Sequence, residues 1–195
     1  MTDLFLIIFA YLLGSLSMAI IACKIAGLPD PRTQGSGNPG ATNVLRLGSK
    51  QLAATVLLGD TLKGFLPVLL ANYLGVSNLT LAATGTAVFL GHCYPVFFSF
   101  KGGKGVATAL GVMLAISWLI GVILITTWIL IVMVFHISSL AAVCTALLAP
   151  LFVALLLPTP ECIAMVCVIS AILVWRHRKN IQNLYRGVEP RIGKR

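Results

Sequence analysis

Long apolar segments follow one another along almost the whole chain, and they constrain its fold more than any other feature. Of the 195 residues, 58% are hydrophobic and only 10% are charged, which is far from the usage of a water-soluble domain. A bilayer core about 30 Å thick is crossed by about 20 helical residues. Apolar segments of that order lie at 4–26, 52–74, 80–99, 106–135, 140–157 and 162–175. The chain is therefore predicted to be an all-α integral membrane protein, with residues 1–195 forming one membrane-embedded domain.

The apolar run 106–135 decides how many crossings we expect. It is too long for one comfortable span, and it contains Ser117 and Trp118, a pair typical of a membrane interface. Division at this pair gives a bundle of about seven transmembrane helices, some of them short, with a periplasmic N-terminus and a cytoplasmic C-terminus. The outer segments then contain no Lys or Arg. The alternative is a bundle of about five spans, in which one helix would have to run through Pro158 and Pro160.

The placement of the charges limits the partners. The formal net charge is +9, but the basic residues flank apolar segments, as the positive-inside rule requires. This pattern excludes nucleic acid and favours anionic lipid headgroups at the membrane surface. The 5 cysteines lie in or beside apolar runs without metal-ligand spacing, so we expect small apolar fillers, no metal site and no cofactor.

Two polar, glycine-rich loops interrupt the apolar sequence. The first is GSGNPGATNVLR at 35–46, and the second is KGGKGVAT at 101–108. Glycines allow backbone N–H groups to turn inward as an anion-binding nest, and Arg46 and Lys104 add positive charge for a phosphate. Neither loop is a nucleotide P-loop, because Gly105 follows Lys104 where Ser or Thr is required, and the first loop has no lysine. The loops predict an enzyme that handles phosphorylated substrates at a bilayer surface.

Two charges lie inside an apolar segment. Asp60 and Lys63 are three residues apart, on one face of the expected helix. Two roles are open: a buried ion pair that organises the bundle beneath the site, or direct contact with substrate. His92 is expected to pack a helix or to orient a loop.

The motifs together resemble a known family. The segments GSGNPGATNVLR (35–46), GHCYPVFFSFKGGKGVAT (91–108) and RHRKNI (176–181) resemble, in order, the three signature motifs of the bacterial acyl-phosphate:glycerol-3-phosphate acyltransferases, and GDTLKG at 59–64 extends the likeness. The resemblance implies a multi-pass enzyme of the bacterial inner membrane with its active site on the cytoplasmic side. Such an enzyme transfers a fatty acyl group from acyl phosphate to the 1-hydroxyl of sn-glycerol 3-phosphate. The products are lysophosphatidic acid and phosphate, in the first acylation step of phospholipid synthesis.

The resemblance also implies roles for individual residues. The essential residues of the family match Ser36, Arg46, Lys104, His177 and Asn180, and a residue needed for integrity matches Glu189. The loop chemistry adds substrate-binding candidates: Gly37, Asn38, Gly40, Ala41, Thr42, Asn43, Lys101, Gly102, Gly103 and Ser139. For Ser138 and Ser139, capping of the helix that begins at Leu140 is favoured over contact with glycerol. The implied partners are acyl phosphate, glycerol 3-phosphate, membrane lipid and the soluble enzyme that makes acyl phosphate.

The identity of the proton acceptor stays open. No Asp or Glu occurs in the three motifs to orient a base. We therefore favour direct acyl transfer, in which His177 and Asn180 orient glycerol 3-phosphate and a substrate phosphate oxygen takes the proton. The alternative makes His177 the general base. As a different class of function, a small membrane transporter of phosphorylated solutes is disfavoured, because the outer half of the chain is almost entirely apolar.

Overall fold

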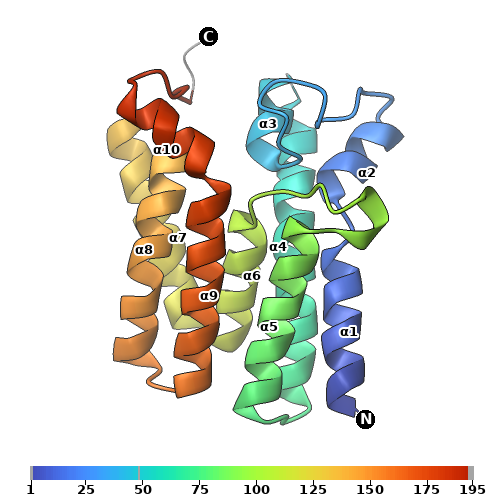
Figure 1. Cartoon of the computed structure of the whole chain (residues 1–195), viewed down its shortest axis with the longest axis vertical. Helices are drawn as coiled ribbons and strands as arrows, with labels where there is room; N and C mark the ends of the chain where they lie inside the picture. Colours follow the sequence, from blue (N-terminus) through green and yellow to red (C-terminus); the bar gives the residue numbers. More distant parts are fainter. Residues whose placement is uncertain (1, 48, 193–195) are drawn as a thin grey trace. The chain divides into compact units, whose positions relative to one another are not determined.

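Two compact units make up the chain, Met1–Ile116 and Ser117–Arg195, which we call the N-terminal and the C-terminal unit. The computed structural model describes residues 2–47 and 49–192, and within these ranges every regular element is helical (Figure 1). The N-terminal unit contains α1 (Thr2–Gly14), α2 (Met18–Ile25), α3 (Ala41–Arg46), α4 (Lys50–Tyr73), α5 (Asn78–Cys93), the 3-10 helix η1 (Val96–Phe98) and α6 (Val106–Ile116). The C-terminal unit contains α7 (Trp118–Phe135), α8 (Ser138–Leu156), α9 (Pro160–Arg176) and α10 (Arg178–Tyr185). That the whole chain is one domain stays a prediction.

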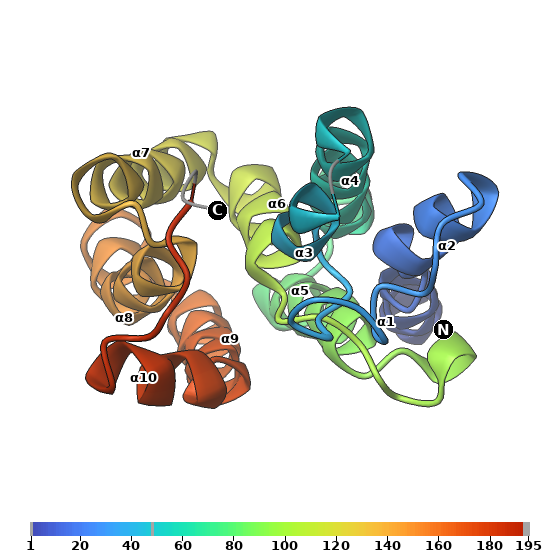
Figure 2. The same cartoon turned by 90° about the horizontal axis from the view of Figure 1, so that it is seen from above.

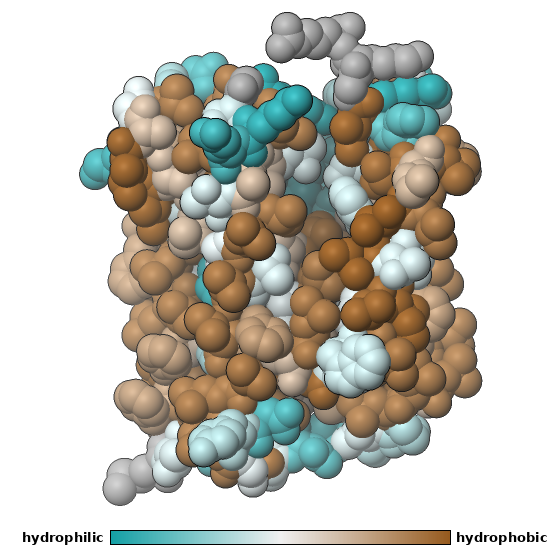
Figure 3. All heavy atoms as spheres, turned by 180° about the vertical axis from the view of Figure 1, so that it is seen from behind, coloured by the Kyte–Doolittle hydropathy of each residue, from teal (hydrophilic) through white to brown (hydrophobic). Residues whose placement is uncertain are grey.

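The helices have the length and composition of membrane spans. Among the described residues, 4 segments are long and apolar enough to cross a bilayer: α4, α7, α8 and Asn78–Phe98, which includes α5 and η1. The count rises to 6 if each of two bent pairs is one broken span, α1 with α2 (45°) and α9 with α10 (56°). Apolar side chains cover the lengths of the helices, whereas hydrophilic side chains gather near the helix ends (Figure 3). The prediction of an all-α, polytopic membrane protein is confirmed.

The expected division of residues 106–135 is also present. The helix α6 ends at Ile116, α7 begins at Trp118, and the Ser117 hydroxyl between them accepts the N–H of Ile120 as an N-cap. α6 is an apolar helix of 11 residues, shorter than the candidate spans, so a seventh crossing stays a prediction. The two continuous helices that the five-span alternative requires, through 106–135 and through 140–175, are not formed. The second is interrupted as well, since α8 ends at Leu156 and α9 begins at Pro160, where proline fits the first helical turn.

Glycines bring the helices of the N-terminal unit into close contact. Lipid tails are as apolar as the side chains, so the hydrophobic effect does not drive membrane helices together. The helices associate instead where small residues let their backbones approach. Here two helix pairs use glycines from both partners. A Cβ atom added to any of these glycines would meet backbone atoms of the opposite helix: Gly14 at Val88 and Gly91 at Tyr11 between α1 and α5, and Gly64 at Thr108 and Gly111 at Thr61 between α4 and α6.

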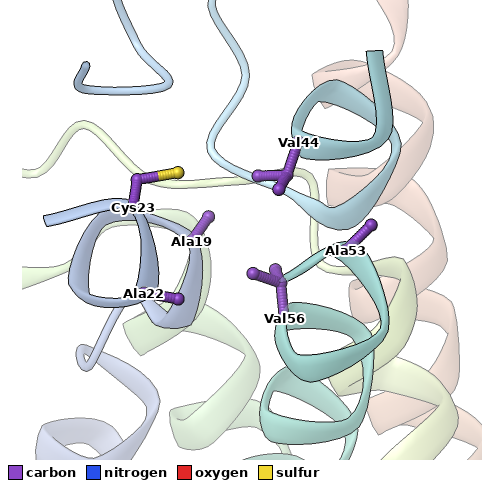
Figure 4. Packing of buried hydrophobic residues seen from close by; sticks show 6 residues of the cluster. All are labelled: Ala19, Ala22, Cys23, Val44, Ala53 and Val56. Carbon is purple, nitrogen blue, oxygen red and sulfur yellow. The ribbon is translucent and has the colours of Figure 1, made fainter. Parts of the chain in front are cut away.

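A cluster of small buried side chains seats the short helix α3. Val44 of α3 is buried and packs in one cluster with side chains of α2 and α4 (Figure 4). Its other members are Ala19, Ala22, Cys23, Ala53 and Val56. Because alanine, cysteine and valine are small, the three helices can pack closely, and Cys23 serves as the apolar filler that the sequence indicated. The cluster fixes the end of the first glycine-rich loop, which α3 follows directly.

The C-terminal unit is a bundle of three long helices completed by α10. Helix α8 packs against α7 on one side and α9 on the other, and α10 contacts α8 and α9. His136 ends α7 in a left-handed conformation (φ 60°), and its carbonyl accepts the N–H of Ile192 at 2.7 Å. The chain after α10 therefore returns to the turn between α7 and α8 (Figure 2).

Candidate active site

Asn43 organises the first glycine-rich loop. Its side chain is buried and makes three hydrogen bonds to the loop's own backbone. The amide Nδ2 donates to the carbonyls of Pro31 (2.8 Å) and Gln34 (3.0 Å), and Oδ1 accepts the N–H of Ser36 (2.9 Å). Gly35 lies so close to Asn43 Oδ1 that a Cβ would collide with it. These contacts make Asn43 the scaffold of the loop, whereas its predicted contact with substrate stays a prediction.

An ion pair precedes the first loop and ties it to η1, the 3-10 helix before the second loop. The Arg32 guanidinium forms a salt bridge with Asp30 at 2.7 Å, and its Nη1 donates to the carbonyl of Phe98 in η1 at 3.3 Å. Hydrogen bonds from Arg32 lower the pKa of the Asp30 carboxyl, and the same contacts raise the pKa of Arg32. The charge of Arg32 was not singled out in the sequence. The spacing Asp-x-Arg before the loop was the available signal.

The remaining candidates of the first loop lie around this scaffold. Ser36 and Gly37 are exposed, Thr42 and Arg46 are exposed on α3, and Asn38, Gly40 and Ala41 are half-buried. The Ser36 N–H is already bonded to Asn43, so the groups that Ser36 presents outward are its hydroxyl and carbonyl. Arg46 lies in the last turn of α3. The loop thus presents an exposed hydroxyl and an exposed guanidinium at the polar end of the unit.

The second glycine-rich loop is packed against the end of α5. The Gly103 N–H donates to the carbonyl of His92 at 3.1 Å. A Cβ on Gly102 would meet that same carbonyl, and one on Gly103 would meet the His92 ring. Gly105 has φ +87°, a conformation that favours glycine, and lies against the ring of Phe89. The glycines of this loop are therefore needed for close packing, while Lys101 is exposed and Lys104 is half-buried.

A buried polar cluster lies under the second loop. Asp60 and Lys63 form the expected ion pair, with Nζ 2.8 Å from Oδ1 and only 4% of each side chain exposed. Lys63 also donates to the carbonyl of Leu16, in the break between α1 and α2, at 2.7 Å. His92 Nδ1 lies 3.6 Å from Asp60 Oδ1. This burial favours the organising role of the pair over direct contact with substrate.

The third motif forms a hydrogen-bonded group in the C-terminal unit. The carboxylate of Glu189 accepts the hydroxyl of Ser139 (2.7 Å) and the Nδ2 of Asn180 (2.6 Å). It thereby fixes α10 to the start of α8, which supports the integrity role expected for Glu189. The expected capping of α8 by Ser138 or Ser139 is wrong, because Ile137 is the N-cap and no side chain caps this end. Ser139 is instead held by Glu189.

His177 lies at the bend between α9 and α10 and is buried. Its Nδ1 lies 2.8 Å from the carbonyl oxygen of Leu173. Because a carbonyl oxygen can only accept, Nδ1 carries a proton, and Nε2 is the nitrogen whose lone pair can take one. Next to it, the guanidinium of Arg178 lies 4.8 Å above the ring of the exposed Trp175, an arrangement suited to a membrane interface.

The candidate residues thus fall into two groups. The N-terminal unit carries both glycine-rich loops, in the half of the unit where α2 and α3 lie (Figures 1 and 2). The C-terminal unit carries His177, Asn180, Ser139 and Glu189. In the described ranges, no group of three His, Cys, Asp or Glu residues is placed to hold a metal ion. The polar side chains available for chemistry are cations, hydroxyls and amides, with one histidine in each group: His92 in the N-terminal unit and His177 in the C-terminal unit.

This fold and these polar loops define a helical, membrane-embedded protein with two glycine-rich loops that carry cationic side chains. Residues 4–187 match the family model described as glycerol-3-phosphate acyltransferase. The glycerol-3-phosphate acyltransferase of Thioalkalivibrio sulfidiphilus is 52% identical over 188 residues, which cover 96% of this chain and 93% of the relative. The chain therefore belongs to the glycerol-3-phosphate acyltransferase family.

Solved structures support the same assignment. This chain is similar to PlsY (YgiH), an integral membrane glycerol 3-phosphate acyltransferase, solved in a glycerol 3-phosphate form. The TM-score is 0.95 at 44% identity, over 99% of this chain and 96% of the other. A structure of PlsY in a lysophosphatidic acid form gives a TM-score of 0.92 at 43% identity, with the same coverage of both chains.

Proposed function

We infer that this chain transfers a fatty acyl group from acyl phosphate to the 1-hydroxyl of sn-glycerol 3-phosphate. The products are lysophosphatidic acid and phosphate, in the first acylation step of phospholipid synthesis. The observation that carries this inference is the likeness, at 44% identity over 99% of the chain, to an acyltransferase solved in a glycerol 3-phosphate form. A second form of that neighbour, with lysophosphatidic acid, supports the proposed product.

The reaction needs little more than two phosphorylated molecules held close together. Acyl phosphate is a mixed anhydride, so its carbonyl is already activated and its leaving group is phosphate. A bond forms between the glycerol oxygen and the carbonyl carbon, the bond to phosphate breaks, and the hydroxyl proton leaves with phosphate. Holding the two reactants in this geometry lowers the activation free energy by an amount on the order of several kcal/mol, because the step no longer has to bring two separate molecules together. Neutralising their mutual repulsion is the other requirement.

The N-terminal unit offers the groups for that task. We assign Arg46 and Lys104 the role of countercharge for phosphate, and the Ser36 hydroxyl the role of a hydrogen-bond donor. The backbone of Gly102 and Gly103 would lie close to glycerol 3-phosphate. The packing of both glycines against α5 supports this assignment, because a loop fixed in advance binds at a lower entropic cost.

Lys104→Ala tests the countercharge role. The variant should raise the KM for glycerol 3-phosphate or abolish turnover while the protein still inserts into the membrane. Lys50→Ala is the matched control, since Lys50 is an exposed lysine at the start of α4. Arg46→Ala should also lose activity. Arg46→Lys should recover little of it, because an ammonium cannot replace a bidentate guanidinium. Wild-type saturation curves in Lys104→Ala would defeat the assignment.

The donor is tested by supplying three donors side by side to the purified protein. Acyl phosphate, acyl carrier protein loaded with the same chain, and the corresponding acyl-CoA should be compared at equal concentration with glycerol 3-phosphate. Acyl phosphate is expected to support lysophosphatidic acid formation, and the other two are not. Turnover with acyl-CoA but not acyl phosphate would reassign the donor and leave the acceptor unchanged.

Proton transfer is assigned to the substrates. In our proposal, His177 and Asn180 orient glycerol 3-phosphate, and a substrate phosphate oxygen takes the hydroxyl proton. The alternative uses His177 Nε2 as the base, since Nδ1 is engaged with Leu173. His177→Gln and His177→Asn keep a hydrogen bond but cannot accept the proton. Residual turnover in either supports orientation, whereas near-total loss in both with intact substrate binding, or an acyl-Ser36 adduct, contradicts it.

We assign the protein to the bacterial inner membrane, with both glycine-rich loops and the C-terminal helix on the cytoplasmic side. The soluble enzyme that makes acyl phosphate would then meet it on that side. Cysteines at the exposed positions Thr33 and Lys101 should react with an impermeant maleimide only after permeabilisation of the cells. One at Asn78 or Thr159 should react in intact cells. Labelling of position 101 in intact cells would invert the topology.

A further inference from the structure

We propose that His92 is a positioning residue for glycerol 3-phosphate binding, which fixes the Gly102–Gly103 backbone and thereby sets the place of Lys104. In this arrangement the buried Asp60–Lys63 pair holds the His92 side chain from below. The proposal rests on the proposed function, because it assigns the glycerol-phosphate site to the second loop. It adds a buried residue in the last turn of α5 to the groups that act on the acceptor substrate.

The contacts between His92 and the loop are close and come from both backbone and ring. Its carbonyl accepts the Gly103 N–H at 3.1 Å, and the same carbonyl lies where a Cβ of Gly102 would stand. The imidazole Nε2 occupies the place of a Cβ on Gly103. Two consecutive loop residues therefore rest on one side chain and its own carbonyl. The next residue along the chain is Lys104.

The opposite edge of the imidazole faces the buried ion pair. His92 Nδ1 lies 3.6 Å from Asp60 Oδ1, and that oxygen lies 2.8 Å from Lys63 Nζ. Lys63 donates to the Leu16 carbonyl, and the Thr108 hydroxyl donates to the Asp60 carbonyl at 3.1 Å. The histidine is thereby connected to α4, to α6 and to the break between α1 and α2, and glycine contacts hold α4 against α6 and α1 against α5. These are rigid elements, and a site residue gains precision from such support.

The physical need for this support comes from the loop's composition. Gly102, Gly103 and Gly105 give the segment a large conformational freedom, and fixing each residue costs about 1–2 kcal/mol of entropy. A flexible loop would lower affinity for a phosphate by that cost at the moment of binding. Close contact with the buried His92 removes the freedom in advance. A ring that only filled space would need no carboxylate at its far edge.

The experiment compares two histidines of the chain. His92→Ala should raise the KM for glycerol 3-phosphate about tenfold or more, with the KM for acyl phosphate changed less than about twofold. His92→Asn should give a shift in the same direction but smaller, because an amide can still donate toward Asp60. The control is His136→Asn, an exposed histidine whose left-handed backbone asparagine tolerates. It should leave both KM values unchanged.

A second measurement reads the loop without substrate. The Gly103 N–H donates to the His92 carbonyl and lies in a buried residue, so it exchanges with deuterated solvent only when the segment opens. This labelling rate should rise at least about threefold in His92→Ala, and should not change in His136→Asn. Mass spectrometry of peptides that contain Gly103 locates the label.

The outcomes separate the two proposals. If the wild-type protein does not acylate glycerol 3-phosphate, the proposed function fails and the labelling rates alone decide the positioning role. Unchanged labelling in His92→Ala overturns it, and so does faster labelling with an unchanged KM, since destabilisation alone lowers the amount of active enzyme without altering KM. If His92→Ala does not yield folded protein, His92→Asn is read by the same criteria.

Discussion

The two glycine-rich loops of the N-terminal unit are held in place by different means. The first is held mainly by its own residues: Asn43 bonds three backbone groups of the loop, and the Asp30–Arg32 pair closes its start. The second is packed against the end of α5 through His92, whose ring lies next to the buried Asp60–Lys63 pair of α4. The first loop is largely exposed, whereas Gly102 and Gly103 are buried.

The difference decides how far each loop can move when a ligand binds: the first loop can adapt, whereas the second is preorganised. An exposed loop with internal hydrogen bonds can shift as a piece when a ligand arrives, because few outside contacts have to break. A loop whose glycines lie against a neighbouring backbone and a buried ring has no room to move. We therefore expect substitutions around the second loop to cost more than matched substitutions in the first.

The largest effect is expected from the buried pair beneath the second loop. Lys63→Met leaves the Asp60 carboxylate buried without its cation and should cost about 3–5 kcal/mol of stability. The double variant Asp60→Asn/Lys63→Met removes both charges and should recover most of that loss. Thermal unfolding in detergent gives the comparison. A single variant as stable as the wild type would mean that water reaches the carboxylate and that the pair does not organise the bundle.

Alanine at matched glycines gives the next effect. Gly102→Ala puts a Cβ against the His92 carbonyl, a backbone atom that cannot turn away, and should cost about 3 kcal/mol. In the first loop, Gly37→Ala pays only for a left-handed backbone (φ +70°), about 1 kcal/mol, since the nearest atom is the Arg32 carbonyl at 3.3 Å. Unfolding temperatures of the two variants check this order. Equal losses would remove the distinction between the loops.

The contrast explains what the sequence could predict. Periodicity, turn residues and charge are local properties of the sequence. They predict the membrane spans, the division of the apolar run at Ser117 and the charged loops. The part played by His92 does not follow from them, because it depends on a contact with Asp60 across 32 positions of the chain that only the folded helices create. The use of the Asn43 amide by its own loop does not follow from the sequence either, since a motif shows which residue types are present but not which way they face. The bond between Ser139 and Glu189, 50 positions apart, is hidden for the same reason.

Asn43 tests the internal scaffold of the first loop. Asn43→Ala removes three hydrogen bonds and should cost about 2 kcal/mol. Asn43→Asp keeps an acceptor for the Ser36 N–H, but it places a carboxylate against the carbonyls of Pro31 and Gln34. It should therefore be no more stable than Asn43→Ala at neutral pH. Recovery of wild-type stability by Asn43→Asp would show that the bond to Ser36 alone holds the loop.

The smallest effect is expected at Arg32, which joins the start of the first loop to η1. Arg32→Ala breaks the pair with Asp30 and the bond to the Phe98 carbonyl, and because both side chains are about 30% exposed it should cost about 0.5 kcal/mol. The stabilisation by the Asp30–Arg32 pair depends on pH, in a direction that the pKa of Asp30 determines. The pKa of Asp30 is lowered from 3.8 in the folded protein, so the pair stabilises the fold above that value, and the contribution disappears as the pH falls through the lowered pKa. Wild-type and Arg32→Ala unfolding temperatures should therefore differ at pH 7 and converge on acidification. A gap that persists undiminished at low pH would assign the effect to the Phe98 bond, and hence to the contact of Arg32 with η1 rather than to the first loop alone.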